Sequence, residues 1–450
     1  MNIILLSGGS GKRLWPLSNG IRSKQFLRIF KKEDGTYESM VQRMYHGILK
    51  ADPQATITIA TSREQHAPLT NQLGEQIDIS YEPCRRDTFP AIALACAYLH
   101  DKRNIAKDAP VIVCPVDPFV DDTYFDALTH LDKLIQSDQA NLTCLGIEPT
   151  YPSEKYGYLI PKDHSPVSPV LTFREKPDLE TAQKYIAEGA LWNGGIFAFR
   201  LGWLLKKASD MIGFSDYTTL YDRYSDIDPI SFDYAVGEKE AHIQVLRFNG
   251  IWKDLGTWNT LTEAMPEQAI GRVTMNNTCK NTHVVSDLDL PILCMGLTDL
   301  VVAASPDGIL VSDKSESSYI KPYVDQMTDE VRYAEKSWGS FRVIDIGDES
   351  LTIKVTLNPG HKMHYHAHAH RDETWTVIAG SGIAMVDGVR TELSPGSFVR
   401  MCAGQKHTVF AKTELQLIEV QTGASISKED KTVFEMPAEL PTEMPAELPT

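Results

Sequence analysis

The 450-residue sequence lacks the features that mark nucleic-acid-binding, membrane or secreted proteins. It has 44 Lys and Arg residues against 60 Asp and Glu residues, so its formal net charge is −16. Nucleic acid is therefore not an expected partner, because binding it needs a basic surface. No apolar run approaches the roughly 18 residues of a membrane span. The N-terminus has no basic segment and its apolar run stops at Leu6, so we expect neither a signal peptide nor membrane association.

Cysteine is also scarce. The seven cysteines are odd in number and scattered, and most lie in apolar runs, which is typical of buried thiols in a reducing compartment. We therefore expect a cytoplasmic protein. With 42% hydrophobic and 23% charged residues, the composition is that of a soluble globular chain, and its length predicts two or three domains.

The clearest local signal lies near the N-terminus, where residues 2–18 read NIILLSGGSGKRLWPLS. The short apolar run at residues 3–6 is typical of a strand buried on both faces. The residues of the following loop that could bind phosphate are Gly8, Gly9, Gly11, Lys12 and Arg13. Backbone N–H groups of such a loop can bind phosphate, and the two basic side chains add charge. An ordinary strand-to-helix turn is the alternative interpretation.

Two better-known phosphate loops do not match this stretch. The Walker A pattern G-x-x-x-x-G-K-[ST] would need Gly where Leu6 stands and Ser or Thr where Arg13 stands. The dinucleotide fingerprint G-x-G-x-x-G, started from Gly9, ends on Leu14 instead of Gly.

Residues 1–265 alternate short apolar runs with helical patterns. We expect strands at residues 56–60, 111–114 and 142–147. Thr88 is expected to cap a helix over residues 89–100. The buried face of the next helix is predicted to be Phe125, Leu128, Leu131 and Ile135. This alternation predicts an α/β, Rossmann-like domain with a mainly parallel sheet, whose ligands bind beyond the carboxyl ends of the strands.

Further motifs follow the glycine loop in a fixed order. They are S-K-Q-F-L (23–27), E-P-C-R-R-D-T-F-P-A (82–91), P-V-D-P (115–118), Y-G-Y (156–158), F-R-E-K-P (173–177), W-N-G-G-I-F (192–197), S-F-D-Y-A (231–235) and W-K-D-L-G-T-W (252–258). Together with the loop they resemble the signature of sugar-1-phosphate nucleotidyltransferases, in particular the mannose-1-phosphate guanylyltransferase branch. Lys12, Asp87, Phe89 and Pro118 depart from that signature.

The resemblance implies roles for individual residues. Binding of the nucleotide phosphates is implied for Gly8, Gly9, Gly11, Lys12 and Arg13, with Glu82 and Arg86 also nucleotide-binding. Lys24 would reach the α-phosphate and Lys176 the sugar phosphate. Sugar-binding residues would be Gly157, Glu175 and Asn193, and Asp117 and Asp254 would bind Mg²⁺. Arg13, Lys24 and Lys176 are the implied catalytic residues. The alternatives are a helix cap for Asp117 and a solvated side chain for Lys176.

The rest of the chain changes character. Residues 266–335 contain short β-like runs between Asp, Asn, Gly and Pro turns, and we interpret them as a β connector and linker. Residues 336–424 are rich in strands with regular turns, which predicts a small barrel. Residues 425–450 end in the direct repeat EMPAELPT, and we expect a disordered tail there, with a partner-binding tag as the alternative.

A metal-binding pattern lies in the predicted barrel. Gly360, His366, His368, Glu373 and Gly380 fit G-(x)5-H-x-H-(x)4-E-(x)6-G, and a second part of the pattern ends at His407. Alternate residues of a strand point to the same side, so His366 and His368 can face one metal, and His364 and His370 share their parity. Three imidazoles and a carboxylate suit a divalent transition metal such as Zn, Co, Mn or Fe. A histidine-rich surface strand is the alternative.

This pattern is the cupin signature, and residues 338–421 resemble the cupin domain of type II phosphomannose isomerases. The segment HAHAHRDETW (366–375) keeps the Arg, Glu and Trp of that family but has His at 366 and Thr at 374. The resemblances together imply an enzyme of polysaccharide biosynthesis that makes GDP-mannose from GTP and mannose 1-phosphate with Mg²⁺. The cupin would either interconvert mannose 6-phosphate and fructose 6-phosphate or serve a structural or sensing role. A different sugar 1-phosphate or nucleotide is a further alternative, and a homo-oligomer is compatible with the sequence.

Overall fold

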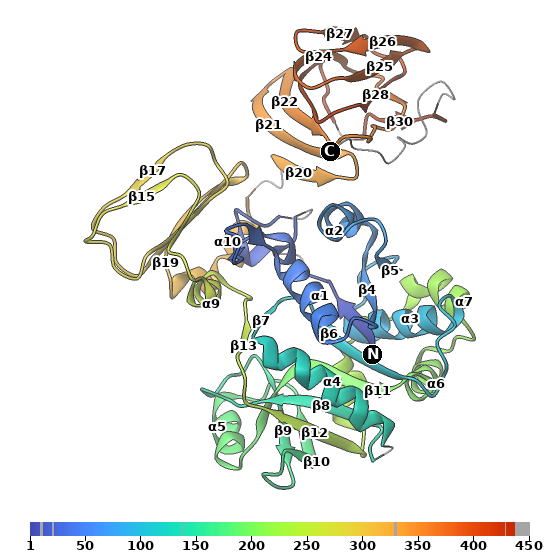
Figure 1. Ribbon diagram of the computed structural model, residues 1–450, viewed down its shortest axis with the longest axis vertical. Helices are drawn as coiled ribbons and strands as arrows, with labels where there is room; N and C mark the ends of the chain where they lie inside the picture. The colour runs from blue at the N-terminus through green and yellow to red at the C-terminus, as the bar shows by residue number, and fades with distance from the viewer. Residues whose placement is uncertain (10–11, 20–21, 138, 328–330, 428, 437–450) are drawn as a thin grey trace.

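The computed structural model describes residues 1–9, 12–19, 22–137, 139–327, 331–427 and 429–436. It has an N-terminal α/β unit, a β connector beside it and a C-terminal barrel of strands (Figure 1). The predicted fold class is confirmed. Among the described residues, no helix is both long and apolar enough to cross a membrane.

A nine-stranded sheet forms the centre of the N-terminal unit. In spatial order its strands are β5 (Asp78–Glu82), β4 (Thr56–Ser62), β1 (Asn2–Leu6), β6 (Pro110–Pro115), β11 (Leu191–Arg200), β8 (Leu142–Ile147), β12 (Ile243–Phe248), β10 (Val167–Arg174) and β9 (Gly157–Pro161). The half from β5 to β6 is parallel, as expected. The other half is mixed, because β9, β10 and β11 run antiparallel to their neighbours. Strand β8 pairs in parallel with β12.

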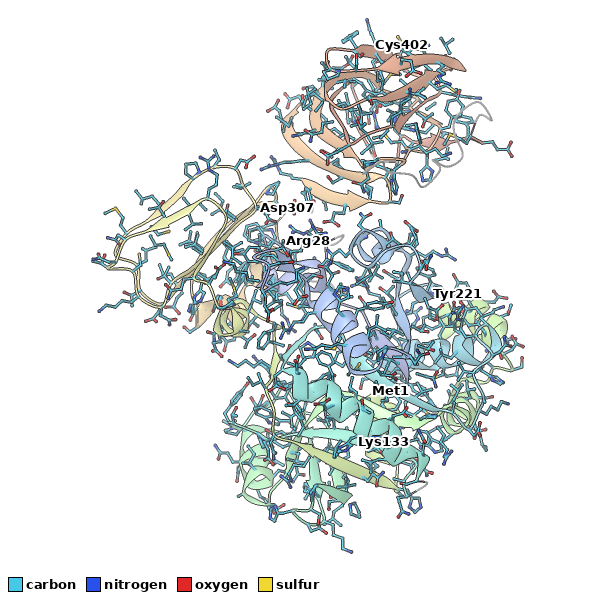
Figure 2. All side chains as sticks on the ribbon, viewed as in Figure 1. Met1, Arg28, Lys133, Tyr221, Asp307 and Cys402 are labelled. Atoms are coloured by element: carbon cyan, nitrogen blue, oxygen red, sulfur yellow. The ribbon has the colours of Figure 1, made fainter. Side chains whose placement is uncertain are left out.

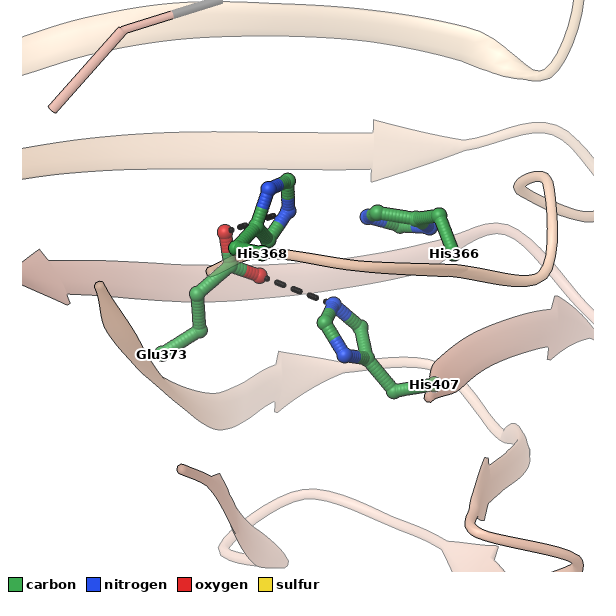
Figure 3. Close-up of side chains that lie close together, drawn as sticks. All are labelled: His366, His368, Glu373 and His407. Carbon is green, nitrogen blue, oxygen red and sulfur yellow. Dashed lines mark hydrogen bonds and ion pairs between the residues drawn. The ribbon is translucent and has the colours of Figure 1, made fainter. Parts of the chain in front are cut away.

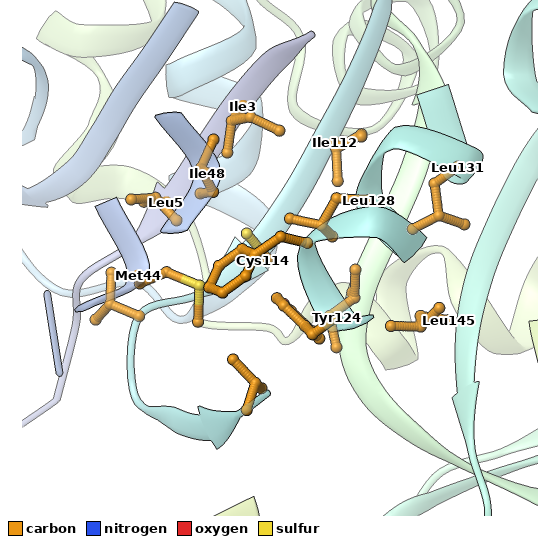
Figure 4. Packing of buried hydrophobic residues seen from close by; sticks show 14 of the residues in the cluster. Ile3, Leu5, Met44, Ile48, Ile112, Cys114, Tyr124, Leu128, Leu131 and Leu145 are labelled. Atoms are coloured by element: carbon orange, nitrogen blue, oxygen red, sulfur yellow. The ribbon is translucent and has the colours of Figure 1, made fainter. Parts of the chain in front are cut away.

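Helices cover both faces of this sheet (Figure 1). They are α1 (Met40–Ala51), α2 (His66–Leu73), α3 (Thr88–Asp101), α4 (Asp122–Gln136), α5 (Leu179–Ala187), α6 (Leu201–Ile212), α7 (Tyr217–Asp222) and α8 (Phe232–Ala235). Ile3 and Leu5 of β1 pack with α1 and α4 in one core cluster, which Figure 4 shows in close-up. Ile4 belongs to a second cluster with α3 and α6. Residues 3–6 of β1 are all apolar because successive side chains enter different cores.

Helix α4 has the predicted buried face, since the four residues expected there are all buried. The expected cap of α3 was wrong. Asp87 is the N-cap, and its side chain accepts a hydrogen bond from the Thr88 backbone N–H at 2.7 Å. Thr88 is instead the first helical residue, and its hydroxyl accepts from the Phe232 N–H at 2.8 Å, which ties α3 to α8.

The connector consists of short strands after α9 (Trp258–Ala264). They are β14 (Ala269–Ile270), β15 (Val273–Met275), β16 (His283–Ser286), β17 (Ile292–Cys294), β18 (Leu300–Ser305) and β19 (Gly308–Asp313). Strands β14, β16 and β18 pair in parallel, and β19 adds antiparallel to β18. The short β-like runs expected in this segment are therefore present as strands.

The connector packs directly on the segment that follows the glycine loop. Leu14 and Leu17 share a core cluster with Val301 and with α10 (Lys321–Val324). The Asn19 side-chain amide donates to Asp307 Oδ2 at 2.6 Å, and Figure 2 labels Asp307 at this junction. The position of the segment after the loop thus depends on a region that follows it by nearly three hundred residues.

Two sheets close the C-terminal barrel. One contains β20 (Tyr333–Lys336), β21 (Gly339–Gly347), β22 (Ser350–Leu357), β29 (Leu415–Thr422), β24 (Asp372–Ala379) and β27 (Phe398–Met401). The other contains β26 (Val389–Leu393), β25 (Gly382–Val386), β28 (His407–Ala411), β23 (His366–Ala367) and β30 (Thr432–Val433). Their inward side chains form one apolar core.

Both predicted ends of the barrel need correction. Strand β20 lies inside the segment expected to be linker, and it pairs with β21. Strand β30 lies inside the predicted disordered tail, yet it pairs with β23. The Phe434 N–H donates to the Tyr365 carbonyl at 2.8 Å, so backbone pairing holds this stretch on the barrel. Most of the repeat, residues 437–450, lies outside the described residues.

Candidate active site and metal centre

The glycine loop lies at the carboxyl end of β1. Gly8 and Gly9 are exposed, and a Cβ built on either meets no atom within 4 Å, so a ligand can approach their backbone. Gly9 has φ +122°, a conformation that side chains with a Cβ rarely adopt. The Ser23 hydroxyl donates to the Gly9 carbonyl at 3.2 Å. Gly11 lies outside the described residues.

The two basic residues of the loop occupy a short 3-10 helix. Arg13 is exposed, whereas Lys12 forms an ion pair with Asp325 of the segment after α10 at 2.9 Å. Arg85, which sequence analysis did not single out, donates to the Gly9 carbonyl at 3.5 Å. The sequence feature that could have pointed to Arg85 is its position next to Arg86, which was predicted to bind the nucleotide.

Lys24 brings the two predicted magnesium ligands together. Its ammonium lies 2.6 Å from Asp117 Oδ2 and 4.0 Å from Asp254 Oδ1. The pairing of β7 (Pro118–Val120) with β13 (Trp252–Asp254) places Asp254 opposite Pro118 and hence close to Asp117. Two carboxylates 137 residues apart in the sequence (254 − 117) therefore converge on one cation. This donor set suits Mg²⁺, which prefers carboxylate oxygens and substrate phosphates.

The charges in this cluster are strongly coupled. Burial alone would lower the pKa of Lys24, but attraction to Asp117 and Asp254 raises it above its ordinary value. Burial raises the pKa of Asp254, and the charge of Lys24 partly offsets that effect. The charge of Arg13 lowers the pKa of both Lys24 and Asp254, so it reaches the same cluster.

A cavity of about 280 Å³ adjoins the two carboxylates. The predicted sugar-binding residues Gly157, Glu175 and Asn193 all line it, together with Asp117 and Asp254. The structure thus brings the predicted metal and sugar residues to one cleft.

The shape of the cavity depends on close backbone packing. A Cβ on Gly157 would lie 2.5 Å from Glu175 Oε2 and 3.3 Å from Asn193 Cβ, so a larger residue would displace the wall of the cavity. Strand β11 has an irregular register between Asn193 and Phe197, and the Asn193 side-chain oxygen accepts from the Gly195 N–H at 3.1 Å. This local bulge directs Asn193 to its position in the wall.

Lys176 lies beside the same wall. Its ammonium pairs with Glu175 Oε1 at 2.7 Å. Its side chain is half exposed and its backbone has φ +44°. Burial would lower its pKa, but the hydrogen bond and charge of Glu175, with Asp233, raise it. Its ammonium is thus held as a cation beside the sugar-binding residues.

Glu82 and Arg86 are not among the residues that line this cavity. The Tyr224 hydroxyl donates to Glu82 Oε2 at 2.6 Å, and burial raises the pKa of Glu82. Arg86 donates to the Ser225 carbonyl. Both side chains are held by the loop after α7, so the structure does not bring them to the metal and sugar residues.

One acid in the cavity, Asp233, was not among the residues predicted from the sequence. Asp233 accepts a hydrogen bond from the Asn193 amide at 2.6 Å and lines the wall with Glu175. Burial, with the nearby Glu175 charge, raises the pKa of Asp233 to about 6. The motif S-F-D-Y-A contains this residue and was the signal that could have identified it.

The barrel contains the predicted histidine cluster. His366, His368, Glu373 and His407 are all buried, and one ligand atom of each lies within 4.8 Å of the others (Figure 3). Glu373 Oε1 lies 3.1 Å from His368 Nε2, and Glu373 Oε2 lies 3.1 Å from His407 Nε2. Burial alone would raise the pKa of Glu373, but its close contacts with His368 and His407 lower it.

The backbone fixes which nitrogen each histidine presents. Nδ1 of His366 contacts the His364 carbonyl at 2.7 Å, and Nδ1 of His407 contacts the Gln405 carbonyl at 2.9 Å. Nδ1 of His368 contacts the Asp430 carbonyl. A carbonyl only accepts, so each Nδ1 carries the proton and each Nε2 lone pair is directed elsewhere. Three such imidazoles and a carboxylate fit a divalent transition metal.

Burial lowers the pKa of His366 to about 3, with Lys431 and His407 contributing, so this ring is neutral near pH 7. His364 and His370 do not share the inward face of His366 and His368, because β23 spans only two residues and both histidines are exposed.

Two further charged residues contact this centre or lie near it. Arg371 Nε donates to Glu373 Oε1 at 2.9 Å, and its Nη2 lies 3.0 Å from His368 Nε2. Glu419 is buried and accepts from the Trp375 indole N–H at 3.1 Å. Burial, with the charge of Glu373, raises the pKa of Glu419 to about 7. Both residues line a cavity of about 560 Å³ that also contains His366 and His368.

The sheet, the glycine loop and the converging carboxylates define a class of enzyme. The chain belongs to the nucleotidyl transferase family, which matches residues 2–269. Residues 325–436 match the family described as mannose-6-phosphate isomerase C-terminal. Both families usually use metal ions.

Similar proteins point to a particular branch. A protein of Salmonella montevideo named mannose-1-phosphate guanylyltransferase is 30% identical over 95% of this chain and 97% of its own. The xanthan biosynthesis protein XanB of Xanthomonas campestris pv. campestris (strain B100) is 30% identical over 96% of this chain and 97% of its own. A crystal structure from Thermus thermophilus, named a mannose-1-phosphate geranyltransferase, superposes with a TM-score of 0.60 at 26% identity, covering 72% of this chain and 98% of that chain.

Proposed function

We propose that the N-terminal domain transfers GMP from GTP to mannose 1-phosphate. A phosphate oxygen of mannose 1-phosphate attacks the α-phosphorus of GTP, the bond to the β-phosphate oxygen breaks, and pyrophosphate leaves with GDP-mannose as the other product. The single observation that carries this proposal is the convergence of Asp117 and Asp254 on Lys24, beside the cavity that contains Gly157, Glu175 and Asn193.

The residues of this chain would act mainly by position and charge. The attacking phosphate is already an anion, so no strong general base is needed, and the main task is to hold two anions together. The N–H groups of Gly8 and Gly9 with Arg13 would hold the β- and γ-phosphates. Lys24 would then leave its carboxylate partners and neutralise charge at the α-phosphate, and Lys176 would hold the sugar phosphate. Asp117 and Asp254 would bind Mg²⁺, which would neutralise the negative charge on the phosphate oxygens.

Relatives support the choice of substrates, since several are named mannose-1-phosphate guanylyltransferase and align over nearly the whole chain. GTP and mannose 1-phosphate are therefore the proposed partners. The free thiols of all seven cysteines suit a reducing compartment, and we place the reaction in the cytoplasm.

The barrel is proposed as a second active site, which interconverts mannose 6-phosphate and fructose 6-phosphate. The observation that favours it is the buried set of three histidines and Glu373. Of these, His366, His368 and Glu373 line a cavity of about 560 Å³. Those four residues would hold Zn, Co, Mn or Fe, which supplies polarisation of the sugar carbonyl. Glu419, with its pKa of about 7, is suited to exchange a proton in that cavity.

A pyrophosphate-release assay with Mg²⁺ tests the first proposal. A panel of nucleoside triphosphates is crossed with a panel of sugar 1-phosphates, and GTP with mannose 1-phosphate is expected to give the highest kcat/KM. A clear preference for another pair would overturn the substrate assignment. A separate isomerase assay on mannose 6-phosphate decides between the active and the structural or sensing cupin.

A further inference from the structure

A network of buried polar side chains lies beside the glycine loop. Its members, none of which is more than 4% exposed, are Ser7, Ser23, Gln25, Thr61 and Gln65. Burying polar groups is costly unless they form hydrogen bonds with one another. Apolar groups of the same shape would fill the space at about the same stability, so the polar side chains indicate a role beyond packing.

Gln65 links the members of this network. It ends a short 3-10 helix that directly follows β4. Its side-chain oxygen Oε1 accepts hydrogen bonds from Thr61 Oγ1 at 2.7 Å, Gln25 Nε2 at 3.1 Å and Ser7 Oγ at 3.2 Å. Its Nε2 donates to the Ser23 hydroxyl at 3.2 Å. One amide therefore connects the carboxyl ends of β1 and β4 with the segment that follows the glycine loop.

One branch of the network reaches the loop itself. The Ser23 hydroxyl, which accepts from Gln65, donates to the Gly9 carbonyl. Glycine changes its backbone conformation at little cost, and a carbonyl oxygen that turned toward a phosphate would repel it. Because the Gly9 carbonyl is held by Ser23, and Ser23 by Gln65, this chain of hydrogen bonds keeps the loop in a shape that accepts an anion.

The other branch reaches the segment that carries Lys24. Gln25 directly follows Lys24 in a short 3-10 helix. Its Nε2 donates to Gln65 Oε1 and also to Ser7 Oγ at 3.2 Å. The helix of Lys24 is therefore anchored to the same amide as the glycine loop, so the separation of the two elements depends on Gln65.

We propose that Gln65 is a positioning residue for the nucleotide, which holds the glycine loop and Lys24 at the separation that one triphosphate requires. The predicted sugar-binding residues Gly157, Glu175 and Asn193 come from β9, β11 and the end of β10, in the other half of the sheet. Gln65 should therefore act on nucleotide binding and not on the sugar phosphate. The inference rests on the proposed transferase function, because it assumes that the loop and Lys24 bind the same nucleotide.

Two measurements on the full-length protein test this proposal. Isothermal titration with GTP and Mg²⁺, in the absence of mannose 1-phosphate, gives the Kd for GTP, and pyrophosphate release gives the KM for each substrate. Gln65→Leu should bind GTP roughly 10-fold more weakly, because the loop loses the hydrogen bonds that fix it. Its KM for mannose 1-phosphate should stay within about 2-fold of the wild type, since additivity holds for independent sites. Gln65→His should retain most of the GTP affinity, because a neutral imidazole also offers one acceptor and one donor.

Two further variants locate the effect. Ser23→Ala removes the link between Gln65 and Gly9 with a small change in volume, and it should also weaken GTP binding. Because the two residues belong to one chain of hydrogen bonds, adding Ser23→Ala to Gln65→Leu should cause little further loss. Gln244→Leu is the matched control. Gln244 is another buried glutamine, whose Nε2 donates to Thr143 Oγ1 at 2.9 Å between β12 and β8, and its loss should leave the Kd for GTP unchanged.

Several outcomes would overturn the proposal. Wild-type GTP affinity in Gln65→Leu and Ser23→Ala is one, and in the event that Gln65→Leu does not fold, wild-type affinity in Ser23→Ala is enough. Equal losses for GTP and mannose 1-phosphate, or an equal loss of GTP affinity in Gln244→Leu, would show a general structural role instead. A wild type that prefers another nucleoside triphosphate would refute the substrate assignment, whereas weaker binding of that nucleotide by Gln65→Leu would still support the role of Gln65.

Discussion

Gly157→Ala should impair the use of the sugar substrate far more than it impairs folding. The new Cβ would lie 2.5 Å from Glu175 Oε2, whereas ordinary contacts begin at 3.4 Å, so the carboxylate must move by about 0.9 Å (3.4 − 2.5). Glu175 is held there by Lys176 at 2.7 Å, so both groups move. A displacement of about 1 Å at a positioning group costs on the order of 100-fold in rate. That loss in kcat/KM for mannose 1-phosphate equals about 2.7 kcal/mol.

The free energy of unfolding should change by no more than about 1 kcal/mol, because Oε2 is the end of a flexible side chain. The assay is pyrophosphate release at varied mannose 1-phosphate and saturating GTP, with thermal unfolding measured in parallel. Gly202→Ala is the matched control, since its Cβ would meet Lys107 Cβ at 2.9 Å at the start of α6, away from the cavity. Equal effects of the two variants on kcat/KM, or an unchanged value for Gly157→Ala, would refute the reasoning.

Three other predictions concern charge and metal. The pKa of Asp233, raised from 3.8 to about 6, means that the folded state holds this proton more tightly than the unfolded chain. The contribution of the protonated Asp233 to stability is therefore greatest below pH 4 and is lost as the pH rises through 6. Between pH 4 and pH 7, the Tm of Asp233→Asn should fall less than the Tm of the wild type. At a metal concentration 100 times its Kd, the barrel metal should contribute about 2.7 kcal/mol to the free energy of unfolding. Removing it with a chelator should therefore lower the Tm of the barrel, and re-addition should restore it; an unchanged Tm would count against metal binding. Truncation after Gly423 removes the Asp430 carbonyl that orients His368. The metal affinity measured by equilibrium dialysis should therefore fall about 10- to 100-fold. An unchanged metal affinity would show that this contact is unimportant.

The sequence was most informative where local chemistry decides the structure. The apolar run of β1 predicted its burial, because successive side chains enter the two cores on opposite faces. The spacing of Phe125 and its three partners predicted the buried face of α4. The spacing of the cupin signature predicted four residues that the fold does bring together.

The sequence was least informative where contacts between distant segments decide the structure. Thr88 looked like a helix cap, but Asp87 supplies the cap and leaves Thr88 to bind Phe232. The tail that ends in the EMPAELPT repeat was expected to be disordered, yet β30 gains its hydrogen bonds from β23, which no local pattern could show. Glu82 and Arg86 lie in a matching motif, but Tyr224 and Ser225 hold them away from the cavity.

The decisive measurement is Mg²⁺-dependent pyrophosphate release from GTP and mannose 1-phosphate by Asp117→Asn and Asp254→Asn. Asp121→Asn is the control, because Asp121 caps α4 through the Thr123 N–H and takes no part in the Lys24 cluster. Each of the two site variants should lose at least about 100-fold in kcat, with partial recovery at high Mg²⁺, while the control keeps wild-type turnover. Wild-type turnover in either site variant would contradict the claim that these two carboxylates hold the catalytic magnesium.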